Sequence, residues 1–551
     1  MAVDPTVRMV TESFTAARSG LPGPGELIAD ALPPSPKPGS ALDPVAASEY
    51  LTRVRLTLEA LADQLAQLYP PDQWIWYTRR LSSDLFSGHL VTTQFADHGV
   101  LETLTGLSRN QEAGVTLGPE GRTIFPFGVE DLRPVASMAA VAVALSQTHS
   151  WIRRAGKGTE FVVRSDDLPE PVLDADLEGA ISVFDERVAA DLQLHWHPAL
   201  ELNASNDKVH HLLGVTMVLG QWPKVLAWEG RLLERRWIWL EGQFHMKLMT
   251  LDGLLDTVAV AGQSGTRWWK KGTPSVVALL QSLWYEATFM SDSVGKNVPK
   301  VGYIRRKRDL AEHFLDLTLP LLQDDLETVF PGEVPKSGAQ VLNDLESVGP
   351  DLWPIQPGPV ARRSGDEVSL DIWAASARLH HDLLIPPQTG GEIVNATAFR
   401  FERVVQDRID KTPWVPSANA RALTRGHLKL NGKTLTDIDA VAEKDGVLLL
   451  ISCKNLPFSP AYDAGEYRVI RNVASTVDNG VEFWRKIVQK LRSDPTGDNY
   501  DVSTFDEVHG VLVTPHTTYS RDSQTLRLLP IDGLTVRAAA SLGELLKALD
   551  G

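Results

Sequence analysis

Cysteine is almost absent from this chain of 551 residues, in which Cys453 is the only one. A single cysteine excludes an intrachain disulfide and any zinc site built from several thiolates. The sequence also has no run of about 18 or more apolar residues, as a transmembrane helix would need. Its first residues, MAVDPTVRMVTESF, lack the basic and then apolar order of a signal peptide. We therefore expect a cytoplasmic protein with no membrane partner.

Several common catalytic motifs are missing too. The VGKN segment at 294–297 lacks the earlier glycine and the hydroxyl of a phosphate-binding P-loop. No Gly-x-Ser-x-Gly elbow, kinase motif set or His-Glu-x-x-His pair is present. These absences argue against a nucleotide-driven motor, a serine hydrolase, a kinase and a zinc protease.

Length and composition indicate a multidomain globular protein, with 43% hydrophobic and 23% charged residues. We expect a mostly α-helical N-terminal region with some α+β structure, followed by a C-terminal α/β core. Helices are expected near 206–220 and 223–259 from apolar and aromatic spacing. Pro- and Gly-rich breaks give the expected divisions: 1–44, an arm and linker; 45–170, an α+β module; 171–348, a helical domain; 349–390, a linker with a helix; 391–551, the C-terminal domain.

Charge is unevenly distributed along the chain. The net charge is −16, yet residues 391–551 hold 20 basic and 21 acidic residues, so residues 1–390 carry the remaining −15. Phosphate binding needs local positive charge, and a basic run precedes the hairpin described next. The residues of this run that we expect to contact nucleic acid are Arg400, Arg403, Arg421, Arg425, Lys429 and Lys433. Basic and aromatic clusters at 267–271 (RWWKK) and 303–308 (YIRRKR) are either further nucleic-acid contacts or solvated charges.

The segment from 435 to 455 predicts a β-hairpin, because two apolar runs, LTDIDAVAE and VLLLISCKN, flank Lys-Asp-Gly. With Asp445 and Gly446 as the turn, Asp439 lies opposite Ser452, and Asp437 lies opposite Lys454. Strand alternation places these four polar side chains on one face. It places the intervening residues, from Ile438 and Ala440 through to Cys453, on the core face.

These residues resemble the PD-(D/E)XK nuclease signature, with Asp439 followed by Ser452-Cys453-Lys454. Glu402, directly after Phe401, is similar to the "FE" of Mrr-type restriction nucleases. The resemblance covers about the last third of the chain. It implies a restriction-endonuclease-like core with a central mixed sheet flanked by helices. It also implies an endonuclease that hydrolyses DNA with Mg²⁺ or Mn²⁺, possible roles being restriction or defence against foreign DNA.

The resemblance also implies individual roles. Asp439 and the main-chain carbonyl of Cys453 would hold the metal, Glu402 would hold a metal-bound water, and Lys454 would orient the attacking water or neutralise the phosphate. Ser452 departs from the family pattern, which has an acid there. Asp437 or Glu466 could supply the missing carboxylate.

Alternatives remain open from the sequence. Asp437 and Lys454 could form an ion pair that closes an inert sheet end, which would make the domain a catalytically inactive binding or scaffolding module. The N-terminal two thirds would recognise substrate, regulate cutting or bind a protein partner, and the chain could form an oligomer.

Overall fold

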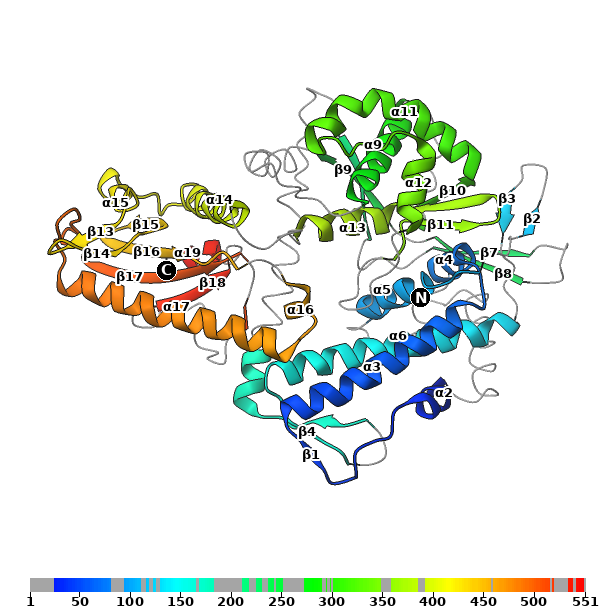
Figure 1. The fold of residues 1–551 in the computed structure, drawn as a ribbon, viewed down its shortest axis with the longest axis horizontal. Helices are drawn as coiled ribbons and strands as arrows, with labels where there is room; N and C mark the ends of the chain where they lie inside the picture. Colours follow the sequence, from blue (N-terminus) through cyan, green and yellow to red (C-terminus); the bar gives the residue numbers. More distant parts are fainter. Residues whose placement is uncertain are drawn as a thin grey trace.

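The computed structural model shows a multidomain α+β protein in which three units follow one another along the sequence (Figure 1). No helix among the described residues is long and apolar enough to cross a membrane. The segments that the structure describes are residues 24–80, 94–110, 115–117, 122–124, 129–164, 168–182, 211–217, 224–229, 236–241, 244–250, 272–289, 294, 298, 301–347, 358–384, 392–456, 459–515, 518–519, 534–538 and 542–549.

The N-terminal unit is a group of helices around one apolar core (Figure 1). The long helices α3 and α6 lie side by side, and α2 and α5 pack against them. Asp43 begins α3 by accepting a hydrogen bond from the Ala46 amide at 2.8 Å, just before Pro44. Its elements are α2 (Pro24–Ala31), β1 (Ala41–Leu42), α3 (Pro44–Ala66), α4 (Pro71–Arg80), α5 (Gln94–Thr105), β2 (Val115–Leu117), β3 (Arg122–Ile124), α6 (Val129–Gly156), β4 (Phe161–Val162) and β5 (Glu170–Pro171).

The expected arm over residues 1–44 is wrong for its described part. Residues 24–31 form α2, and Ile28 and Leu32 pack against the core of the N-terminal unit. The two apolar side chains are four residues apart, which puts both on one helix face. The Pro- and Gly-rich composition concealed this short helix.

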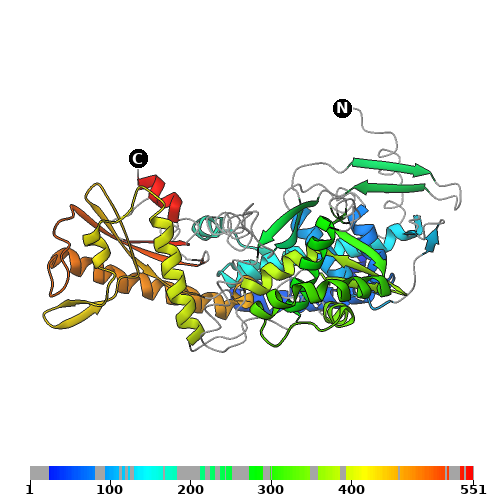
Figure 2. The same cartoon turned by 90° about the horizontal axis from the view of Figure 1, so that it is seen from above.

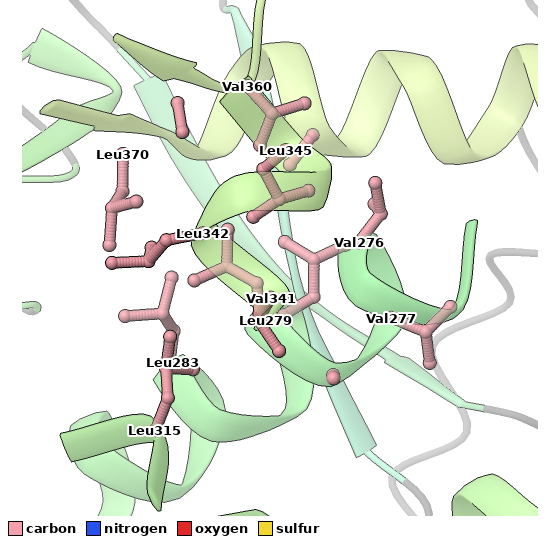
Figure 3. Packing of buried hydrophobic residues seen from close by; sticks show 14 of the residues in the cluster. Val276, Val277, Leu279, Leu283, Leu315, Val341, Leu342, Leu345, Val360 and Leu370 are labelled. Atoms are coloured by element: carbon pink, nitrogen blue, oxygen red, sulfur yellow. The ribbon is translucent and has the colours of Figure 1, made fainter. Parts of the chain in front are cut away.

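The central unit combines helices with a three-stranded antiparallel sheet in the order β10-β12-β11. Figure 3 shows side chains from α9, α11, α12 and the sheet packed into one apolar cluster. Its elements are β6 (His211–Met217), β7 (Lys224–Glu229), β8 (Arg236–Glu241), β9 (Phe244–Thr250), α9 (Thr273–Phe289), β10 (Tyr303–Lys307), α11 (Arg308–Val329), α12 (Gly338–Ser347), β11 (Ala361–Ser364), β12 (Glu367–Asp371) and α13 (Ile372–Leu384).

The expected helices over 206–220 and 223–259 are wrong for their described parts, and the expected helical domain over 171–348 also contains strands. Strands β6 and β9 pair with each other, as do β7 and β8. The register sets Trp228 opposite Trp237. Trp237 and Trp239 occupy alternate positions, a period of two that is typical of a strand. The helical interpretation counted the aromatic residues without this alternation.

The expected linker over 349–390 is also wrong for its described part. Strands β11 and β12 form a hairpin that pairs with β10, and α13 follows directly. Val360, Val368 and Leu370 are buried in the core shared with α9, α11 and α12. Residues 358–384 therefore belong to the central unit. Only the helix within the expected linker is confirmed.

The C-terminal unit has a four-stranded mixed sheet, in the order β15-β16-β17-β18. The β15–β16 pair is antiparallel, whereas β16–β17 and β17–β18 are parallel. Strands β13 and β14 form a separate two-stranded sheet. The elements of the C-terminal unit are α14 (Glu392–Ile409), α15 (Ala418–Ala422), β13 (Leu428–Leu430), β14 (Lys433–Thr436), β15 (Ala440–Lys444), β16 (Val447–Cys453), α16 (Pro460–Asp463), α17 (Tyr467–Ser493), β17 (Glu507–Thr514), β18 (Leu534–Ala538) and α19 (Leu542–Leu549).

Strand β16 is apolar throughout because helices cover both faces of the sheet. Leu448 and Leu450 pack with α17, whose Trp484 Nε1 donates a hydrogen bond to the Leu450 carbonyl at 3.2 Å. Leu449 and Ile451 pack with α14 and α19 on the other face. Thus the sequence correctly predicts a central mixed sheet, but it predicts only one of the two apolar faces of the hairpin.

Helix α17 extends past the sheet to reach α6 of the N-terminal unit (Figures 1 and 2). A Cβ atom at Gly156 would lie 2.2 Å from the Gly465 carbonyl, so the two segments meet closely enough to require glycine. Tyr519 Oη donates to the Lys157 carbonyl at 3.1 Å in the same contact. A direct backbone contact therefore joins the C-terminal unit to the N-terminal one.

Candidate functional site

The candidate site lies where β15 begins and β16 ends. Asp445 and Gly446 have φ angles of +49° and +81°, which fits the predicted Asp-Gly turn. The register runs from Lys444 opposite Val447 to Ala440 opposite Ile451. The predicted turn and register are therefore confirmed up to Ala440, and Asp439 is the next residue outward.

The Asp439 side chain ends the β-ladder. Its Oδ2 accepts a hydrogen bond from the Cys453 amide at 2.6 Å, while its own amide donates to the Ile451 carbonyl at 3.2 Å. A carboxylate thus takes the place of a backbone carbonyl at the end of β16. Because regular pairing stops here, Ile438 packs with the α17 face and not with Ala440. The predicted alternation, with four polar side chains on one face, is wrong beyond Ala440.

Ser452 supports Asp439. Its side chain is buried, with 7% of the residue exposed, and it forms a hydrogen bond with the Asp439 carboxylate. The described geometry therefore gives Ser452 the role of a hydrogen-bond partner within the site.

Cys453 has the environment of a packed apolar residue. Burial raises the pKa of its thiol, and the Asp439 and Glu402 carboxylates raise it further. Its side chain contacts the apolar cluster under α14. A role as nucleophile is therefore disfavoured.

Glu402 reaches the site from α14. Val405 and Ile409, three and seven residues later, are fully buried against the sheet and fix this helix face. Burial raises the pKa of Glu402 to about 6, and the negative charges of Asp439 and Asp437 add to this effect. Glu402 thus lies close enough to both aspartates for their charges to act on it.

The pKa of Asp439 is raised as well. Burial is the largest cause and the Asp437 charge adds to it, whereas the Cys453 amide, Lys454 and Ser452 oppose the shift. Asp437 itself is exposed. Asp437 and Lys454 therefore act on Asp439, and both aspartates act on Glu402, at the end of β16.

Gln406, one turn after Glu402, was not expected to matter. Its Nε2 donates to the Val441 carbonyl at 3.1 Å and its Oε1 accepts from the Val441 amide at 3.0 Å. A side-chain amide thus pairs with the outer edge of β15 as a neighbouring strand would. These bonds hold α14, and with it Glu402, beside the strand that leads from Asp439. A glutamine four residues after the glutamate is the only signal in the sequence.

Lys454 lies over the middle of α17. A Cβ atom at Gly480 would lie 3.7 Å from Lys454 Cε and 3.0 Å from Leu512 Cδ1, so this glycine makes room for the lysine. The Lys454 amide donates to the Val513 carbonyl at 2.8 Å, which fixes its backbone beside β17. The sequence gave no indication of the role of Gly480.

Glu466 is not brought to this cluster. It is exposed at the N-terminal end of α17 and precedes Gly480 by 14 residues. At 1.5 Å per residue this places it about 20 Å along the helix from Lys454. The expectation that Glu466 supplies a second carboxylate is wrong, and Asp437 is the residue near Asp439.

The oxygen atoms available at this site suit Mg²⁺, which keeps several bound waters, better than a metal ion whose ligands all come from the protein. Among the described residues, no group of three or more His, Cys, Asp or Glu side chains could hold a metal ion. Magnesium, however, uses one or two carboxylates and keeps several waters. Glu402, Asp439 and the Cys453 carbonyl match this preference in kind. The raised pKa values of both carboxylates are what a bound cation would lower.

An inert ion pair between Asp437 and Lys454 is not formed, although both residues are described. Ion pairs of the described C-terminal unit include Arg421–Asp410 at 2.8 Å and Lys486–Glu482 at 2.7 Å. Lys454 acts instead on Asp439, whose pKa it lowers. The ion pair between Asp437 and Lys454 that a catalytically inactive domain was expected to form is therefore missing.

The expected nucleic-acid contacts lie on α14, on and after α15, and on the β13–β14 hairpin. Arg421 forms an ion pair with Asp410, so its side chain is less available to contact a phosphate. The Arg400 side chain lies outside the described part of the structure. The other four are exposed, on α14, after α15 and on the β13–β14 hairpin: Arg403, Arg425, Lys429 and Lys433.

The basic cluster at 303–308 is neutralised within the protein. Arg305 pairs with Asp72 at 2.7 Å, and Arg306 pairs with Glu286 at 3.1 Å. Arg308 contacts Glu312 and Glu346. These arginines therefore form ion pairs within the central unit and between it and α4, which argues against phosphate contacts by this cluster. The cluster at 267–271 lies outside the described residues.

Comparisons with known proteins give no family for this chain. No protein-family model, no curated protein and no solved structure matches it. The geometry described above is therefore the basis for the functional proposal.

Proposed function

We propose that the C-terminal unit is a Mg²⁺-dependent nuclease that hydrolyses DNA phosphodiester bonds. The observation that carries this proposal is the crowding of Glu402, Asp439 and Asp437 beside Lys454. Burial and mutual repulsion raise the pKa of the first two carboxylates. Raised carboxylate pKa values are expected where carboxylates are arranged to bind a cation or a proton. A sheet end with a structural role alone does not require them.

The residues have distinct roles in this proposal. Asp439 and Glu402 would hold Mg²⁺ or Mn²⁺ together with the main-chain carbonyl of Cys453. The bound ion supplies charge neutralisation at the phosphate and lowers the pKa of a bound water. Lys454 places a positive charge where the phosphate would enter. Glu402, with a pKa of about 6, is ionised at neutral pH and can accept a proton.

The remaining parts of the chain would direct this activity. Exposed basic residues near β15, including Arg403 and Lys433, would contact the DNA backbone. The N-terminal and central units would recognise the substrate or bind a protein partner. These features fit a cytoplasmic enzyme, monomeric or oligomeric, that acts in restriction or in defence against foreign DNA.

Cleavage of supercoiled plasmid tests the proposal directly. The full chain is incubated with Mg²⁺, Mn²⁺ or EDTA, alongside Lys454→Ala and Asp439→Asn. Asparagine keeps an acceptor for the Cys453 amide but removes the charge, so this variant should fold. Lys547→Ala, an exposed lysine of α19, is the matched control.

We expect metal-dependent nicking that falls at least about 100-fold in both site variants. The control should stay within about twofold of the wild-type rate. The proposal fails if the wild-type protein cuts neither plasmid, single-stranded DNA nor RNA with either metal. It also fails if both site variants cut as fast as the control.

A second function, a DNA-binding module without catalysis, is favoured by one observation. In the described part of the chain no group of three or more metal-ligating side chains is present, and Ser452 stands where the resemblance implies an acid. A gel-shift assay separates the two functions. Binding without cleavage, unchanged by Mg²⁺ and by Asp439→Asn, would support the inactive module.

A further inference from the structure

A cavity of about 650 Å³ lies between the N-terminal and central units. Gly106 and Ser108, which follow α5, form one wall. Glu346 of α12 and the segment from Pro359 to Arg363 form the others. A volume of this size is typical of small-molecule sites. The nuclease proposal uses none of these residues.

Arg362 brings a buried positive charge to this wall. Only 2% of the residue is exposed, and its hydrogen bonds go to uncharged acceptors. Nη1 donates to Thr105 Oγ1 at 3.3 Å, and Nη2 donates to the Glu102 main-chain carbonyl at 3.4 Å. Among the described residues, Nε has no hydrogen-bond partner. A guanidinium has five donor hydrogens, so most of this capacity is unused within the described part of the protein.

Other buried arginines of the same region are paired with carboxylates. Arg79 donates to both oxygens of Glu102 and to Asp371 Oδ2 at 2.9 Å. Arg79 therefore pairs with Asp371 and Glu102, the two carboxylates whose charges act most strongly on Arg362. Burial lowers the pKa of Arg362 even though Asp371 and Glu102 oppose the shift. A buried charge with so little direct compensation is unfavourable.

Arg363 adds a second guanidinium to the cavity wall and is exposed. Its Nε donates to the Gly365 carbonyl at 3.2 Å. The acidic wall residue, Glu346, is engaged by Arg308. Positive charge therefore predominates along the walls.

Two glycines allow the segments beside Arg362 to approach each other closely. A Cβ atom at Gly106 would lie 2.2 Å from Pro359 Cδ, and one at Gly358 would lie 2.9 Å from Arg362 Nη2. Larger residues at either position would push the α5 loop and the start of β11 apart. The cavity thus depends on a close contact between two units.

We propose that this cavity binds a small molecule that carries a phosphate group, with Arg362 and Arg363 as its cationic partners. A phosphate monoester carries a charge of about −1.5 to −2 at pH 7, which matches two guanidinium groups better than a single carboxylate does. Arginine also binds phosphate through two parallel hydrogen bonds. The volume suits a mononucleotide. A bound ligand would hold the α5 loop against β11.

Calorimetric titration of the full chain in EDTA tests the site without any metal at the C-terminal unit. The probes are adenosine 5′-monophosphate, inorganic phosphate and adenosine. Arg363→Gln is the main variant because this side chain is exposed and should not be needed for folding. Arg362→Gln is tested if circular dichroism shows that it folds. Lys336→Gln, exposed in the same unit, is the matched control.

We expect saturable binding of the nucleotide with one site per chain, and none of adenosine. Arg363→Gln should weaken binding at least about tenfold, whereas Lys336→Gln should leave it within about twofold. Equal affinity for inorganic phosphate would identify the free anion as the ligand, and a preference for the nucleotide would identify a phosphate ester. Absence of saturable phosphate binding would overturn the proposal, as would equal binding by Arg363→Gln and wild type.

Discussion

Replacing Glu402 by glutamine should stabilise the region around the candidate site at neutral pH in the absence of metal. The substitution keeps the shape of the side chain and removes one of three neighbouring negative charges. In the folded protein the pKa of Glu402 is about 6, against an ordinary value of 4.5. A carboxyl group with a raised pKa binds its proton more tightly in the folded state, so it lowers stability as the pH rises from 4.5 to 6.

The magnitude follows from the two pKa values. The difference between 4.5 and about 6 corresponds to about 2 kcal/mol at pH values above this window. Because Glu402 is only half-buried, solvent screening reduces the expected effect to about 1 kcal/mol. Glu402→Gln should therefore gain about 1 kcal/mol over wild type at pH 7.5 and nothing at pH 4.

Hydrogen exchange measures this effect locally. Peptides from α14 and the β15–β16 hairpin should exchange about fivefold more slowly in Glu402→Gln than in wild type at pH 7.5 in EDTA. The difference should disappear at pH 4, and Mg²⁺ should slow exchange in the wild type more than in the variant. Asp407→Asn, on the exposed side of the same helix, is the control. Equal or faster exchange in Glu402→Gln at pH 7.5 would refute the mutual repulsion of these carboxylates.

Three further predictions concern the support of the site. Asp439→Ala should destabilise the C-terminal unit by about 1–3 kcal/mol because the Cys453 amide loses its acceptor, whereas Asp439→Asn should not, as urea unfolding would show. Gln406→Ala should increase exchange at the Val441 amide at least tenfold and weaken any metal binding, since it frees the edge of β15. Gly446→Ala should lower stability by about 1 kcal/mol or more in the same unfolding assay because of its positive φ angle; an unchanged midpoint would contradict this strain.

Several features of the C-terminal unit could be predicted from the sequence because they depend on neighbouring residues. The Asp445-Gly446 pair specifies a turn with positive φ angles, and the turn then determines which residues lie opposite each other. The apolar residues at alternate positions of 447–453 indicate a strand with one face in the core. The proximity of Asp439 and Lys454 follows from this local geometry.

Predictions failed where distant segments had to meet. The hairpin of β11 and β12 looked like part of a linker until its pairing with β10 was seen. The period of two in β7 and β8 was hidden by the abundance of Trp residues. Asp439 was assigned to a regular strand, but its side chain ends the ladder by binding the Cys453 amide.

The sequence by itself determined the turn, the register and the candidate residues of the hairpin, because turn chemistry and side-chain periodicity act over a few residues. Only the tertiary structure decided that Asp437 and not Glu466 joins Asp439, that Gln406 fixes α14 to β15, and that Arg362 is buried without a carboxylate of its own. These outcomes depend on contacts between segments separated by tens to hundreds of residues. Packing decides such contacts, and no local pattern records them.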